Sequence, residues 1–158
     1  TTALALLRKG ELNRSGGVWS EGVPEGVFTS EHLLDHSDSW ETRPKYGLNA
    51  YTFKKDTIID IVVVNSILRK GFYSQHPWHL HGHSFWVMGT GPGMFPGVAN
   101  VPAAHRAAKP LYTDTVTSFP DHWLWLRVKL NNPGLWPFHC HMVWHLAMGL
   151  QVHFAVLK

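Results

Sequence analysis

The sequence has 158 residues, of which 44% are hydrophobic and 13% aromatic, and its formal net charge is +3. This length is typical of one domain, and the composition excludes an intrinsically disordered chain. The basic residues are scattered, and no apolar run approaches the ~18 residues of a membrane span, so we expect neither nucleic acid nor a membrane as a partner.

Residues 1–45 are rich in glycine, serine, proline and charged residues. They predict an irregular N-terminal segment or interdomain connection, with at most one weak helical turn at 29–35. The segment Thr1–Leu7 has no basic leader, so we expect no signal peptide in it. Asn13 opens an Asn-Arg-Ser triplet, which would accept a glycan in a secreted protein.

Beyond residue 45 the sequence takes on the character of strands, because β-branched and aromatic residues dominate it. A long surface loop is predicted at 91–110, and a short loop or helical turn at 142–147 joins the last two strands. Several short strands separated by turns predict an all-β fold, a sandwich or a barrel. The predicted strands are 51–53, 57–65, 83–88, 113–119, 122–130, 136–141 and 149–157.

Twelve histidines stand against a single cysteine, and most of the histidines are clustered. The first cluster reads His76-Pro77-Trp78-His79-Leu80-His81-Gly82-His83. The second reads His139-Cys140-His141, with His145 five residues after the cysteine and Leu150 ten residues after it. A lone cysteine cannot form an internal disulfide, so Cys140 is free, bonded to another chain, or a metal ligand.

Successive side chains on a strand point to opposite faces. His139 and His141 therefore share one face, and Cys140 points to the other. The same alternation puts His79 and His81 together, whereas His76 has the opposite parity. One strand can in this way hold ligands for two separate metal sites.

A thiolate with two imidazoles is the trigonal ligand set of blue-copper electron-transfer sites. Cys140 supplies the thiolate, and His145 can return to the same metal across a loop. His76 completes the set from a neighbouring strand. Leu150 occupies the position of a weak axial ligand but has no donor atom, so we expect a three-coordinate copper with a raised reduction potential.

Four histidines then remain as an all-imidazole group that faces another way: His79, His81, His139 and His141. Imidazole suits copper, zinc or iron, and the adjacent thiolate site makes copper the natural choice. A zinc hydrolase or deaminase site is disfavoured because neither cluster contains a carboxylate that could act as general base.

His76–Val87 and Trp136–Leu150 resemble the two C-terminal copper signatures of multicopper oxidases, the family of laccases and ascorbate oxidases. The resemblance implies a cupredoxin-like Greek-key β-sandwich or barrel, with residues 46–158 as the C-terminal cupredoxin domain. It implies that the type 1 copper ligands are His76, Cys140 and His145. It also implies that His79 binds the type 2 copper, and that the type 3 pair is bound by His81, His139 and His141. His83 lies inside the motif and is expected to serve in packing or support.

The family's trinuclear copper cluster needs two further His-X-His pairs, and this sequence has none outside its two clusters. The resemblance therefore implies a partner, either a second chain or a cleaved N-terminal portion that carries those pairs. It also implies an extracellular protein that uses a small reducing substrate, a phenol, a diphenol or an ascorbate-like compound, and dioxygen.

In the leading hypothesis, a reducing substrate gives up single electrons at the edge of His145. The electrons pass through Cys140 and along His139 and His141 to the cluster, where dioxygen is reduced to water. Two side chains that flank His145 are candidates for lining the substrate approach: Trp144 and Met148.

Two alternatives stay open from the residues alone. A non-enzymatic blue-copper electron carrier would explain the thiolate site but leave the all-imidazole group without a role. A half-site of the copper nitrite reductase type also joins two coppers through a Cys-His pair, but does not require all four imidazoles.

Overall fold

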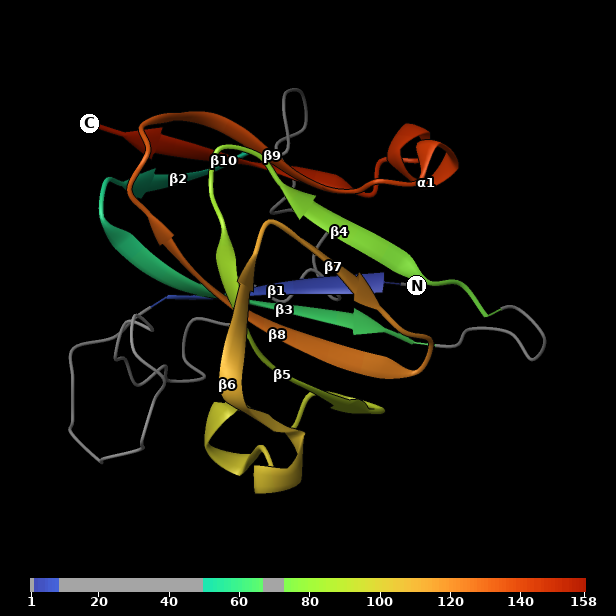
Figure 1. Ribbon diagram of the computed structural model, residues 1–158. Helices are drawn as coiled ribbons and strands as arrows, with labels where there is room; N and C mark the ends of the chain where they lie inside the picture. Colours follow the sequence, from blue (N-terminus) through green and yellow to red (C-terminus); the bar gives the residue numbers. More distant parts are fainter. Residues whose placement is uncertain (1, 9–49, 67–72) are drawn as a thin grey trace, which may run out of the picture.

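The computed structural model describes residues 2–8, 50–66 and 73–158, with only the backbone described for 2–8 (Figure 1). Two five-stranded sheets face each other, so the prediction of an all-β sandwich is confirmed. The first sheet has the order β1 (Thr2–Arg8), β3 (Thr57–Asn65), β8 (His122–Leu130), β5 (Phe85–Pro92) and β6 (Arg106–Thr113). The second has the order β2 (Ala50–Lys54), β10 (Gln151–Leu157), β9 (Gly134–Cys140), β4 (His76–Leu80) and β7 (Thr115–Ser118).

Helical structure is scarce in the described ranges. Two short 3₁₀ helices, η2 (Val98–Asn100) and η3 (Ala103–His105), lie between β5 and β6. The α-helix α1 (Val143–Ala147) joins β9 to β10, where a loop or helical turn was predicted. In these parts of the chain no helix is both long and apolar enough to cross a membrane.

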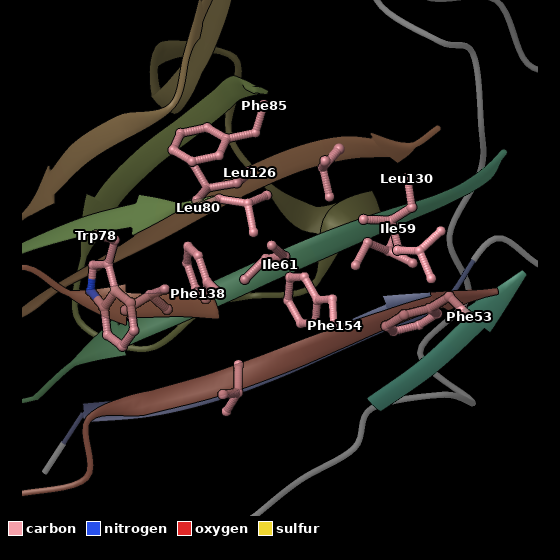
Figure 2. Packing of buried hydrophobic residues seen from close by; sticks show 14 of the residues in the cluster. Phe53, Ile59, Ile61, Trp78, Leu80, Phe85, Leu126, Leu130, Phe138 and Phe154 are labelled. Atoms are coloured by element: carbon pink, nitrogen blue, oxygen red, sulfur yellow. The ribbon is translucent and has the colours of Figure 1, made fainter. Parts of the chain in front are cut away.

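The main core lies between the two sheets, as Figure 2 shows. Alternate residues of β3 and β8 supply one side of it, including Ile59, Ile61 and Leu126, none of which is exposed. The second sheet supplies aromatic side chains, among them Phe138 and Phe154, whose rings stack with centroids 5.9 Å apart. Through this core, β4 and β9, the strands that carry the two histidine clusters, pack against the first sheet.

The residues that alternate with the main core form a second buried layer on the other face of the first sheet. A salt bridge is its polar centre: Arg127 Nε lies 2.8 Å from Asp60 Oδ1, and both side chains are fully buried. Arg127 Nη2 and Trp125 Nε1 donate to the other carboxylate oxygen at 2.9 and 2.7 Å. Burial raises the pKa of Asp60, and the hydrogen bonds from Arg127 and Trp125 oppose that rise.

The prediction that residues 1–45 are irregular is wrong at their N-terminal end, where Thr2–Arg8 forms the strand β1. This strand pairs antiparallel with β3, from Thr2 opposite Asn65 to Arg8 opposite Ile59. Alanine and leucine dominate this segment and are not strong strand formers, so the open edge of β3 rather than local propensity accounts for the strand. The predicted helical turn at 29–35 lies outside the described residues, and the boundary near residue 46 stays a prediction.

The predicted loop at 91–110 also ends earlier than expected. β6 begins at Arg106 and pairs with β5 from Gly89 opposite Arg106 to Phe85 opposite Thr113. Pro110 lies within β6, which is possible because β6 is an edge strand and needs hydrogen bonds on one side only. The predicted strand at 113–119 is divided at Asp114, where the chain leaves the first sheet and enters β7 of the second.

Candidate metal centre

The second sheet brings the two histidine clusters side by side. β4 lies between β7 and β9, and its register with β9 places Trp78 opposite Cys140 and His79 opposite His139. α1 follows β9 and lies at the same end of this sheet as the beginning of β4 (Figure 1). His76, which begins β4, is thereby brought close to both Cys140 and α1.

The thiolate site consists of His76, Cys140 and His145. Cys140 Sγ lies 3.6 Å from His76 Nδ1 and 3.5 Å from His145 Nδ1. All three donor atoms lie within 4.8 Å of one another. Cys140 and His76 are buried, whereas His145 is half-buried and reaches the surface at α1.

Backbone hydrogen bonds close the loop that returns His145 to Cys140. The Leu150 amide donates to the carbonyl of His145 at 2.9 Å, and the Cys140 amide donates to the carbonyl of Leu150 at 3.0 Å. Gly149 between them has a φ of 87°, a conformation that favours glycine. The Leu150 side chain contacts the main core and, as a hydrocarbon, has no donor atom to offer the site.

The electrostatics of the thiolate site suit a neutral imidazole. Burial, together with the neighbouring His145, lowers the pKa of His76 to about 4. His76 therefore presents an unprotonated nitrogen at neutral pH, the form that binds a metal. Burial raises the pKa of the Cys140 thiol, so a metal that binds here must displace its proton.

The chemistry of these three donor atoms suits copper. A soft thiolate with two imidazoles, held without a carboxylate, is the set that blue-copper sites use. Among the described residues, this is the one group of three or more histidine, cysteine or acidic side chains whose donor atoms are so closely spaced.

Four imidazoles, here named the quartet, form a second group: His79, His81, His139 and His141. In five of the six pairs of these rings the centroids are 4.7 to 5.9 Å apart, from His79–His81 to His79–His141. The Nε2 atoms of His81 and His139 lie 3.0 Å apart, so nitrogen atoms from both clusters converge on one region. His139 is buried, whereas His81 and His141 are exposed, so the quartet opens to the surface of the chain.

Supporting hydrogen bonds select the ring nitrogen that each of two quartet members presents. His79 Nδ1 lies 3.0 Å from the carbonyl oxygen of Asp114 and 2.9 Å from Thr115 Oγ1. Since a carbonyl only accepts, Nδ1 carries the hydrogen, and Nε2 of His79 is left as the donor atom. His139 Nδ1 likewise lies 3.1 Å from the carbonyl of Cys140, which leaves its Nε2, the atom close to His81 Nε2, as the metal donor.

His83 has the parity of His79 and His81 but lies apart from the quartet. It is buried, its Nε2 accepts the Asn132 amide at 3.2 Å, and its ring meets that of Trp136 edge to face at 5.8 Å. Burial lowers its pKa, in keeping with this role as an acceptor.

Of the five remaining histidines, three lie in the part of the chain that the structure describes and two lie outside it. His122 and His105 belong to neither group: His122 Nδ1 lies 2.8 Å from the carbonyl of Pro120, and the His105 ring lies beside Trp123. His153 lies on β10, and its buried Nδ1 has no hydrogen-bond partner among the described residues. His32 and His36 fall outside the described residues.

Trp144 and Met148, the candidate substrate-approach residues, are both 80% exposed. Trp144 lies in α1 and Met148 directly follows it, while His145 turns toward Cys140. Their predicted role stays a prediction.

Two supporting elements, Asp114 and the turn at 131–134, could not be identified as such from the local sequence. In the structure the first holds His79 and the second contacts the histidine-rich turn after β4. Their positions beside the clusters depend on sheet pairing, which the local sequence does not report.

Comparison with known proteins agrees with this geometry. The multicopper oxidase family profile matches residues 24–158. The chain is 38% identical over 138 residues to an L-ascorbate oxidase of Cucurbita maxima, an alignment that covers 87% of this chain and 23% of that protein. It is 31% identical over 147 residues to Laccase-13 of Arabidopsis thaliana, covering 86% of this chain and 25% of that protein.

Solved structures give the same result. The structure of Fet3p, described as a multicopper oxidase that functions in iron import, matches with a TM-score of 0.58 and 30% identity over 68% of this chain and 21% of that one. The laccase from Botrytis aclada matches with a TM-score of 0.56 and 31% identity over 68% of this chain and 19% of that one.

These relatives are much longer than this chain, which spans 25% or less of the length of each of the four. The match of the family profile nevertheless extends over most of the sequence and includes every residue of the thiolate site and the quartet. The chain therefore belongs to the multicopper oxidase family, a family of copper-dependent oxidoreductases.

Proposed function

We propose that this chain is the C-terminal, copper-binding part of an oxidase that takes single electrons from a small reducing substrate and reduces dioxygen to water. One observation carries the proposal: Cys140 of the thiolate site lies directly between His139 and His141 of the quartet. The two groups are thus joined by a single stretch of backbone.

The residues divide into two ligand sets. His76, Cys140 and His145 would hold a type 1 copper, His79 a type 2 copper, and His81, His139 and His141 the type 3 pair. Copper in these sites supplies one-electron redox chemistry. Half-buried His145 is the member of the thiolate site nearest to solvent, so its ring edge is the proposed point of contact with the reducing substrate.

The main core and the closed loop from Cys140 to Leu150 hold the thiolate site in place before any substrate binds. Such support limits how far the ligands move and tunes the site's potential.

The open quartet supports the proposal of a partner. His81 and His141 are exposed, so their imidazoles can meet ligands from outside this chain. We propose that two further His-X-His pairs, on a separate chain or on another part of the same polypeptide, complete the cluster. The electron-carrier alternative would leave these four imidazoles without a role.

Phenols, diphenols and ascorbate-like compounds are the proposed substrates, and dioxygen is the proposed acceptor. An extracellular location is proposed from the family resemblance and from the glycan triplet at Asn13, which lies outside the described residues.

The test of this function is oxygen consumption by the native protein with each substrate class. Consumption that depends on substrate and is lost when a chelator removes copper supports the oxidase. A blue protein that accepts electrons but consumes no oxygen with any of them would instead be an electron carrier.

Thr115→Val tests the support of His79. Valine keeps the shape of threonine but removes the hydroxyl that contacts His79 Nδ1, while the Asp114 carbonyl remains. Loss of such a supporting partner typically weakens metal binding about 10- to 100-fold, and we expect the lower end for the quartet. The measurement is copper bound to the quartet at controlled free copper. Thr117→Val on the same strand is the control, and an equal loss in both variants would contradict the account.

Leu150→Met tests the axial position. A thioether near the thiolate site would add a donor that favours the oxidised copper, so we expect a lower reduction potential in a redox titration of the blue absorption. Leu150→Val, which adds no donor, is the control. A potential that is unchanged or raised in the methionine variant would show that residue 150 does not face the metal.

A further inference from the structure

The turn that follows β4 is held by three residues here named the clamp: His83 within the turn, and Asn132 and Trp136 outside it. This turn carries His81 and consists of residues 81–84, between the end of β4 and the start of β5. Gly82 within it has a φ of 66°, so the turn depends on a conformation that side chains disfavour.

Each member of the clamp makes a specific contact. His83 Nε2 accepts the amide of Asn132 at 3.2 Å, and its Nδ1 lies 3.4 Å from the carbonyl of His81. Asn132 Nδ2 donates to the carbonyl of Gly82 at 3.1 Å. Trp136 Nε1 donates to the carbonyl of Asn132 at 2.8 Å. The carbonyls of His81 and Gly82 are thus both engaged by the clamp.

Trp136 also covers Gly82 by direct packing. A Cβ atom at Gly82 would lie 2.4 Å from Trp136 Cε3, so the ring rests against the bare backbone. The His83 ring meets the same indole edge to face. The turn has little space to shift without displacing Trp136.

The clamp also links the two halves of the quartet. Trp136 lies on β9, the strand that continues to His139, and the His81 amide donates to the carbonyl of Pro137 at 2.9 Å. A fixed turn therefore fixes where His81 lies relative to His139, whose Nε2 atoms are 3.0 Å apart.

We propose that His83 is a positioning residue for the quartet: through Asn132 and Trp136 it sets the separation of His81 from His139 and thereby the affinity of the quartet for copper. This inference rests on the proposed function, because it takes the quartet as a copper site. It assigns His83 no contact with the metal.

The test compares His83→Phe and His83→Gln in the native holoprotein, stripped and reloaded with copper. Phenylalanine keeps a ring against Trp136 but removes both hydrogen bonds, whereas glutamine can still accept the Asn132 amide. We expect His83→Phe to weaken copper binding by the quartet about 10- to 100-fold, and His83→Gln to restore part of it. The blue absorption of the thiolate site should stay unchanged in both, because none of its ligands contacts the clamp.

Two further variants keep the test decisive. Asn132→Ala changes an exposed residue, so it should fold even if His83→Phe does not, and it should show a smaller loss that is again confined to the quartet. His122→Phe, at a histidine that is outside the clamp and both ligand groups and whose Nδ1 lies 2.8 Å from the Pro120 carbonyl, should change nothing.

Full occupancy of the quartet by copper in both His83→Phe and Asn132→Ala would overturn the inference. An equal loss of copper from the quartet and from the thiolate site would overturn it as well. If the unmodified protein itself holds copper only at the thiolate site, the proposed function fails first, which separates the two failures.

Discussion

Replacing Cys140 with serine is expected to abolish the blue absorption and to reduce substrate-driven oxygen consumption to the background rate. Serine is close to cysteine in size, but its hydroxyl is not the soft thiolate that this ligand set requires. Cys140 is the one cysteine in the sequence, so no other thiolate of this sequence can take its place. Visible absorption and an oxygen electrode measure the two effects.

Copper at the quartet should survive this replacement, because its four imidazoles are unchanged. The number of copper ions per protein should therefore fall only by the copper of the thiolate site. A Cys140→Ser protein that stays blue, or that still consumes oxygen at the original rate, would contradict the assignment of this site.

Asp60→Asn is expected to lower the free energy of unfolding by about 3–5 kcal/mol, because it leaves the buried Arg127 without a counter-charge. The pair is fully buried, and the carboxylate accepts from both Arg127 and Trp125. Asparagine can accept some of these hydrogen bonds but carries no charge. Urea unfolding of the native protein, followed by tryptophan fluorescence, measures the change.

Asp56→Asn is the matched control for this prediction. Asp56 pairs with Lys129 at 3.6 Å, but both side chains are about half exposed, and such pairs contribute less than about 1 kcal/mol. Asp56 has a φ of 65°, a conformation that asparagine also accepts. Equal losses in the two variants would show that burial does not govern the strength of the Asp60 pair.

The fold class could be predicted because the strands of the core have strong local signals. The segments 57–65 and 122–130 are dense in β-branched and aromatic residues, and the structure has β3 and β8 at those positions. β1 was missed because its strand depends on pairing with β3, and β6 was missed apart from Thr113 because the prolines of 91–110 indicated a loop.

The opposite directions of Cys140 and its neighbours His139 and His141 could be predicted from strand alternation. Cys140 faces His76 and His145, and its neighbours His139 and His141 face the quartet. Distances could not be predicted, because they depend on which strands pair. β4 contacts β9 across a long stretch of sequence, and only that register brings His79 opposite His139.

The supporting residues were the least predictable part of the site. Asn132 and Thr115 lie in a turn and an edge strand whose local sequences indicate only those structures. Their hydrogen bonds to the Gly82 carbonyl and the His79 ring join segments that lie 50 and 36 residues apart. Contacts of this kind follow from the packing of the second sheet and not from a motif.

The most direct test of the account is to purify the native protein, identify its polypeptides by mass spectrometry, and count copper per protein together with the blue absorption. We predict a blue protein with one copper at the thiolate site and additional copper at the quartet, and a polypeptide that carries two further His-X-His pairs. A blue protein that consists of this chain alone with a single copper would contradict the account and identify an electron carrier.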